Sequence, residues 1–141
     1  MLTGMRRLAV SALVFAIGVA ACGGASSGPA SWDGPPRPFP EDGVLAVDGF
    51  NDYADTVEGD WQLDPGRVAL EFTRASNGDV TVDGDRVTVL RDDLEDDSVR
   101  AERYVLELRE DGDEWRVDSA RWEQRCHVGR GHQEFSPELC V

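Results

Sequence analysis

The strongest constraint on the fold is a series of alternating segments from residue 79 onward, separated by Asp-Gly pairs. Side chains that alternate between apolar and polar have the two-residue period of a β-strand with one buried face. Asp83-Gly84 and Asp111-Gly112 supply residues typical of tight hairpin turns. The alternating apolar residues around these turns are Val80, Val82, Val87, Val89, Tyr104, Leu106, Leu108, Trp115 and Val117. The pattern predicts a four-strand antiparallel meander.

The last predicted strand changes its pattern partway along. Trp115 and Val117 lie at one parity, whereas the next apolar residues, Ala120 and Trp122, lie at the other. Two explanations are open: both faces of this strand are covered, or a β-bulge near Asp118-Ser119 shifts the register by one residue. We favour the bulge, because it keeps the apolar side chains on one face.

Two short helical patterns precede the strands. Asp64-Pro65 combines a residue that caps helices with a proline suited to the first helical position. We therefore predict a helix over 65–75, although Val68, Leu70 and Phe72 also alternate as they do in a strand. The earlier pattern contains a candidate N-cap, an apolar face at helical spacing and a terminating glycine: Asp48, Phe50, Tyr53, Ala54, Val57 and Gly59. One or two short helices followed by a meander make an α+β fold, whose sheet packs its apolar face on the helices.

This order of elements resembles the nuclear transport factor 2-like (cystatin-like) α+β fold. The resemblance covers about 60–125 and ends in a hairpin of the form Tyr-Val-Leu-Glu-Leu…Asp-Gly-Asp-Glu-Trp-Arg-Val. It implies a curved sheet wrapped around a helix, an arrangement that encloses a pocket in many such domains. This chain has fewer predicted helices than the usual members of that fold.

The amino end has the features of an export signal. Arg6 and Arg7 precede an apolar run over 8–21, which is too short to cross a roughly 30 Å hydrocarbon core but suits a secretory signal peptide over 1–21. The segment Val19-Ala20-Ala21-Cys22 resembles the lipobox of bacterial lipoproteins. That resemblance implies cleavage before Cys22, acylation of this cysteine, and anchoring on the extracytoplasmic face of the cell membrane. An ordinary signal peptide and an uncleaved anchor are the alternatives.

The segment over 22–43 is rich in Gly, Ser and Pro and offers little apolar surface. We predict that the lipidated Cys22 is followed by a disordered tether over 23–43. The remaining residues, 44–141, then form one small α+β domain.

Both remaining cysteines lie near the carboxyl end. If Cys22 carries lipid, Cys126 and Cys140 are left to pair, and an oxidising compartment favours that pairing. Closing this loop is worth roughly 3 kcal/mol in the chain-entropy model. The alternative is a zinc site from Cys126, His127, His132 and Cys140, although the spacing is unusual for zinc. The tail has the pattern Arg-Cys-x-x-Gly-Arg-Gly-His-Gln-x-Phe-x-x-x-Leu-Cys over 125–140. This pattern resembles the tail of uncharacterised actinobacterial exported proteins, which implies a shared fold and no activity.

The same tail contains a local group of cations. Arg125, Arg130 and His132, with two glycines that expose backbone N–H groups, form a candidate anion-binding turn. The competing interpretation is that these arginines pair with neighbouring carboxylates.

Other chemistry has weaker support in the sequence. His132 with Glu134 or Glu138 is a possible general-base pair, but no recognisable nucleophile or metalloprotease motif is present, and we expect neither catalysis nor a cofactor. The acidic run over 92–97 lacks the glycine and the spacing of a dedicated calcium loop.

The composition narrows the class of partner. The chain has 28 Asp plus Glu against 14 basic residues, all arginine, for a net charge of −14, which argues against nucleic-acid binding.

From these sequence features together, we expect a lipid-anchored binding or accessory module whose partners are the membrane and an unidentified envelope protein or small ligand. A metal- or anion-binding module centred on the 125–140 loop is the alternative.

Overall fold

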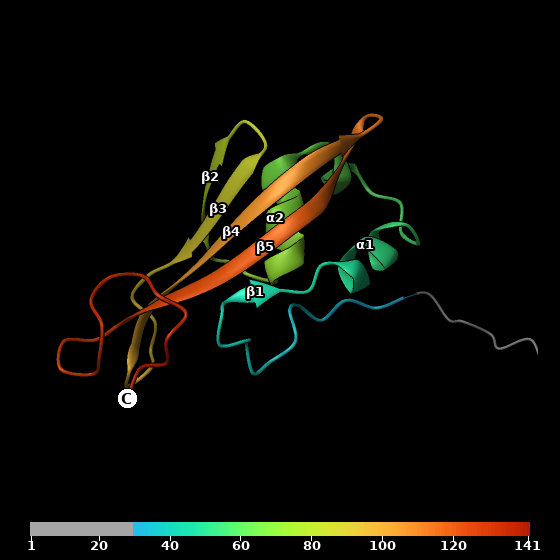
Figure 1. Cartoon of the computed structure of the whole chain (residues 1–141). Coiled ribbons are helices and arrows are strands. Elements are labelled where there is room, and N and C mark those ends of the chain that lie inside the picture. Colours follow the sequence, from blue (N-terminus) through green and yellow to red (C-terminus); the bar gives the residue numbers. More distant parts are fainter. Residues whose placement is uncertain (1–29) are drawn as a thin grey trace, which may run out of the picture.

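The computed structural model describes residues 30–141, so the predicted signal peptide, Cys22 and the first part of the predicted tether lie outside the described residues. Figure 1 shows a sheet with helices on one of its faces. The helical elements are α1 (Asp48–Ala54), the 3-10 helix η1 (Asp60–Leu63) and α2 (Pro65–Thr73). The strands are β1 (Val44–Leu45), β2 (Asp79–Asp83), β3 (Arg86–Arg91), β4 (Val99–Asp111) and β5 (Glu114–Cys126). No helix among residues 30–141 is long and apolar enough to cross a membrane.

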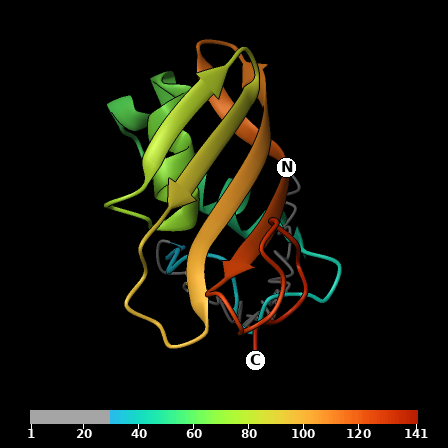
Figure 2. The same ribbon diagram turned by 90° about the vertical axis from the view of Figure 1, so that its left-hand side faces the viewer.

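All strands pair antiparallel in the order β1-β5-β4-β3-β2, which confirms the α+β class and the predicted four-strand meander. Both predicted turns are present as two-residue connections. Gly84 and Gly112 occupy their first positions with φ of 63° and 66°, values that favour glycine. The short strand β1 was not predicted, and it adds a fifth strand beside β5. Figure 2 shows how strongly the long strands β4 and β5 curve.

Helix α2 lies across the sheet and begins where the capping pattern predicts. The carboxylate of Asp64 accepts a hydrogen bond of 2.9 Å from the backbone N–H of Arg67, and Pro65 takes the first helical position. Val68 and Phe72 are fully buried against the sheet. The helical interpretation of this segment is therefore confirmed over the strand alternative.

Helix α1 differs from its prediction at both ends. Val47, and not Asp48, is its N-cap residue, and no side chain caps it. It ends at Ala54, before the predicted glycine. Asn51 explains the position of the helix: its side-chain amide donates to the carbonyl of Val117 and accepts from the N–H of the same residue, at 2.8 Å and 3.2 Å. This pair of bonds fixes α1 to β5.

The predicted β-bulge lies where the apolar parity changes. Glu107 pairs with Ser119 and the next residue, Leu108, pairs with Val117, so Asp118 is the extra residue. Trp122, beyond the bulge, thus faces the same core as residues before it. A second irregularity lies at Arg100, near the start of β4 and opposite the end of β5.

The folded part begins earlier than the predicted domain boundary at residue 44. Trp32 is 9% exposed and lies between Phe50 and Phe72, with ring centroids at 5.4 Å and 5.5 Å. Its indole N–H donates to the carbonyl of Phe72 at 2.8 Å. Phe39 also packs against the core. Residues 30–43 therefore belong to the folded part, because two aromatic side chains supply the apolar surface that the Gly- and Pro-rich composition concealed.

Candidate functional site

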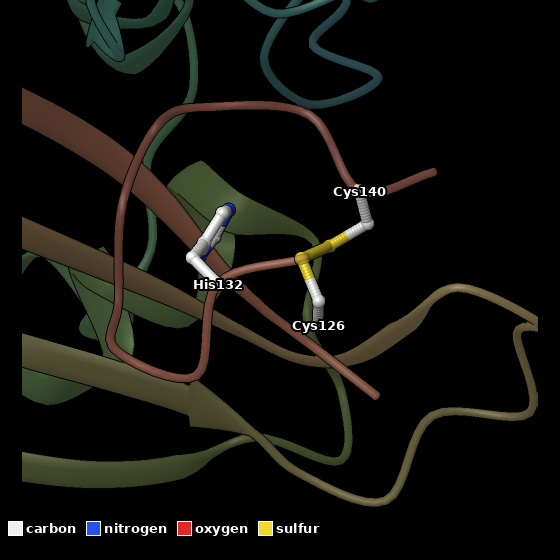
Figure 3. Close-up of side chains that lie close together, drawn as sticks. All are labelled: Cys126, His132 and Cys140. Carbon is white, nitrogen blue, oxygen red and sulfur yellow. A yellow bond between two sulfur atoms is a disulfide. The ribbon is translucent and has the colours of Figure 1, made fainter. Parts of the chain in front are cut away.

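The carboxyl-terminal loop is closed by a disulfide between Cys126 and Cys140 (Figure 3). The S–S distance is 2.10 Å and the two Cα atoms are 5.5 Å apart, which is ordinary disulfide geometry. The bridge joins the end of β5 to the penultimate residue of the chain. The backbone N–H of Cys126 donates to the carbonyl of His132 at 3.0 Å, which folds the loop back on the strand. The predicted pairing is confirmed.

His132 lies within this loop and is surrounded by acceptors. Its Nδ1 is 2.7 Å from the carbonyl oxygen of Glu134, and its Nε2 is 2.8 Å from that of Glu138. A doubly protonated ring donates to both carbonyls, whereas a neutral ring donates to only one. Both contacts are with backbone atoms, so the suggested histidine–carboxylate pair is not formed.

Three of the four residues of the zinc hypothesis converge. Ligand atoms of Cys126, His132 and Cys140 lie within 4.8 Å of one another, and within 30–141 this is the one such group of three or more potential ligands. His127 is not part of it. Since the two sulfur atoms are bonded to each other, neither is a thiolate, and the oxidised loop lacks the ligands that zinc needs.

Of the arginines proposed to bind an anion, Arg125 already contacts other groups of the protein. Arg125 Nη2 is 3.2 Å from both carboxylate oxygens of Asp92, and its guanidinium lies 5.1 Å from the ring centroid of Phe135. The backbone N–H of Asp93 and then Arg125 lower the pKa of Asp92. An anion at Arg125 would have to displace this carboxylate. Arg130 is exposed.

The acidic run forms a turn between β3 and β4. Asp96 accepts hydrogen bonds from the backbone N–H groups of Val99 and Ser98, at 2.7 Å and 2.8 Å, and these bonds lower the pKa of Asp96. Arg100 lies 3.7 Å from Asp92. These contacts give two of the acidic side chains structural partners.

A pocket that sequence reasoning missed lies at the end of the sheet nearest this loop. Residues 33–39, which we call the strap, contribute their last three residues to its wall, and the pocket has a volume of about 260 Å³. We call it the strap pocket. Its walls are Arg37, Pro38, Phe39, Leu94, Asp96, Val99, Glu102, Trp122, Gln124 and Leu139.

An ion-pair network centred on the buried carboxylate of Glu102 lies at one wall of the strap pocket. The carboxylate of Glu102, whose side chain is 8% exposed, accepts from Arg91 at 3.0 Å and from Arg37 at 3.3 Å. Arg37 also lies 3.5 Å from the hydroxyl of Tyr104. Burial, and next the charge of Glu102, raise the pKa of Tyr104 to about 12. The hydroxyl therefore stays protonated at neutral pH.

Trp122 forms the floor of the same pocket. Its side chain is 3% exposed, and the ring of Phe39 covers it at a centroid distance of 4.5 Å. The indole Nε1 has no hydrogen-bond partner among the described residues, nor has Nε of Arg91. Such unpaired buried donors are rare in folded proteins and call for an explanation.

A signal for this site is present in the strand pattern. Glu102 continues the parity of Tyr104 and Leu106, and its cross-strand partner Gln124 continues that of Trp122. Polar residues at core parity mark the place where the apolar face of the sheet becomes a polar pocket. The apolar residues of the two strands alone do not mark this pocket.

Comparison with protein-family models, with characterised proteins and with solved structures finds no match for this chain.

Proposed function

We propose that this chain is an extracytoplasmic lipoprotein, anchored to the cell membrane through acylated Cys22, whose folded part acts as a non-catalytic binding module. The observation that supports the proposal most is the disulfide between Cys126 and Cys140. Disulfides persist in oxidising compartments, and this one uses two of the three cysteines. The third, Cys22, is the residue that the lipobox resemblance assigns to the lipid.

The proposal places the folded part close to the membrane. Only residues 23–29 separate Cys22 from the described part, a segment that spans at most roughly 25 Å when fully extended. The net charge of −14 opposes close contact with anionic lipid. The module would thus stand beside the membrane and present its surface to molecules of the envelope.

The contacts of the polar groups favour a small-molecule site in the strap pocket over a metal or anion site in the tail. In the tail, the two cysteine sulfurs are bonded and Arg125 is paired with Asp92, which weakens the metal and anion hypotheses. The strap pocket instead combines apolar walls with a few buried polar groups, as small-molecule sites do.

Fractionation of bacteria that express the full chain tests the anchor. We expect the protein in the membrane fraction, resistant to a salt wash and extracted by detergent, with an amino-terminal peptide that carries acyl mass on Cys22. The Cys22→Ser variant should lose the acyl mass. As a second readout, the denatured, unreduced native protein should contain no free thiol. A native protein that washes off in buffer and lacks acyl mass would refute the proposal.

A further inference from the structure

Trp122, one wall of the strap pocket, carries a buried indole N–H that has no hydrogen-bond partner among the described residues. Leaving a buried donor without an acceptor is energetically costly, because the group loses its hydrogen bond to water and gains none in return. The backbone carbonyls and side chains of the described residues supply no acceptor to Trp122 Nε1. An acceptor from outside the chain would remove this cost.

The charges of the strap pocket indicate a neutral ligand. Two guanidinium groups, Arg37 and Arg91, face the carboxylate of Glu102, and Asp96 already accepts two backbone N–H groups. Arg91 is not one of the pocket walls, but it pairs with Glu102, so the two arginines together balance the two carboxylates. An anion would meet two carboxylates, and a cation would compete with two arginines for Glu102. A neutral molecule avoids both costs.

The walls set the size and polarity of the ligand. Phe39, Leu94, Val99 and Leu139 are apolar, and the volume of about 260 Å³ lies just below the range of drug-sized pockets. A compact, largely apolar molecule fits these walls.

Side-chain contacts, and not backbone hydrogen bonds, hold the cover over Trp122. No backbone group of 33–39 makes a hydrogen bond with another backbone group among the described residues. The strap is held here by side chains: Phe39 is half-buried on Trp122, and the Arg37 side chain, 59% exposed, reaches Glu102. Movement of the Phe39 ring therefore breaks no backbone hydrogen bond, and the Arg37 guanidinium, 4.3 Å from the centroid of this ring, would move with it.

We propose that the strap pocket binds a small neutral molecule with an apolar body and a carbonyl, ether or hydroxyl oxygen that accepts the indole N–H of Trp122. This inference rests on the proposed function as a binding module, and it names the chemical class of the ligand.

The matched probes 1-indanone and indane, which differ by one carbonyl oxygen, test the proposal. The full chain carrying C22S is labelled with ¹⁵N-tryptophan, and the indole N–H signals are followed by NMR during titration. We expect 1-indanone to shift the Trp122 signal saturably, and indane to bind about fivefold to tenfold more weakly because it offers no acceptor. Benzoate, an anion of similar size, should bind more weakly than 1-indanone.

The variant Trp122→Phe keeps an aromatic ring and removes the donor. It should assign the signal, weaken 1-indanone by about fivefold to tenfold and leave indane within about twofold. Trp115→Phe, at the far end of the hairpin, should change neither. If Trp122→Phe fails to fold, the native titrations decide alone.

Equal binding of both probes, tighter binding of benzoate, a shift confined to another tryptophan, or no saturable shift would overturn the proposal. Any of these results would leave the anchor untouched, because fractionation and acyl mass test it independently.

Discussion

At the scale of single residues, Tyr104 links burial to the pH dependence of stability. Its pKa is raised to about 12 in the folded state, first by burial and second by the charge of Glu102. Below about pH 10 the hydroxyl is protonated in both the folded and the unfolded chain, so its full contribution to the free energy of unfolding is present. Between about pH 10 and about pH 12 the unfolded chain releases the proton while the folded chain retains it. Stability is therefore lost over this interval.

We predict that the native protein loses roughly 2–3 kcal/mol more stability than Tyr104→Phe between about pH 9 and about pH 12. Urea unfolding of both proteins at a series of pH values measures the difference, and the subtraction removes alkaline effects common to the two. Parallel losses in both proteins would show that burial does not hold this proton.

Gly131 shows how closely the tail packs on its disulfide. Its φ is 137°, and a Cβ added there would lie 2.9 Å from Cys126 Sγ. We expect Gly131→Ala to cost roughly 2–3 kcal/mol, measured by urea unfolding. Gly129→Ala is the matched control: φ is 83° but nothing lies within 4 Å, so only the backbone cost of roughly 1 kcal/mol applies. Equal costs would mean that the contact with the sulfur does not matter.

The predictability of the site differs from residue to residue. The pairing of Cys126 with Cys140 follows from counting cysteines once Cys22 is assigned to lipid, and the structure confirms the pair. The strap pocket could not be predicted in the same way. Its walls come from the strap, the β3–β4 connection, two strands and the tail, and no local spacing brings Phe39 to Trp122.

At the scale of elements, the two α-helices differ in whether a side chain caps their amino-terminal end. Asp64 makes a side-chain cap bond at the start of α2, whereas Asp48 makes none at the start of α1. Asp64→Ala should therefore cost about 1 kcal/mol, and Asp48→Ala only a few tenths from the helix dipole. Thermal and urea unfolding of the two variants give the comparison. If Asp48→Ala proves the more damaging change, the boundary of α1 described here is wrong.

Elements with a strong repeating pattern were predicted, and those without one were missed. The parity change between Val117 and Ala120 was enough to place the bulge at Asp118. Strand β1 has two residues, too few to show any period. Its position instead depends on Gly43, where a Cβ would lie 2.5 Å from the carbonyl oxygen of Trp122. Such a close approach of two chain segments is a tertiary fact that no window of sequence contains.

At the scale of the whole molecule, the boundary between tether and folded part was misplaced because composition was averaged over 22–43. The prolines and glycines of this segment dominate the average, but Trp32 lies in the core and Phe39 packs against it. Arg74 adds to this attachment by donating to the carbonyl of Trp32 at 2.9 Å. Residues 30–43 thus belong to the folded part and not to the predicted tether.

The attachment of this segment is testable by removing its largest side chain. Trp32→Ala deletes the contacts with Phe50 and Phe72 and leaves the carbonyl of Phe72 without its donor, so we expect a loss of about 3–5 kcal/mol in urea unfolding. Leu63→Ala, an apolar truncation at a site that is 56% exposed, should cost less than about 1 kcal/mol. A similar small cost for both variants would return residues 30–43 to the tether. The predicted contrast would instead fix the start of the cooperative unit at or before Trp32.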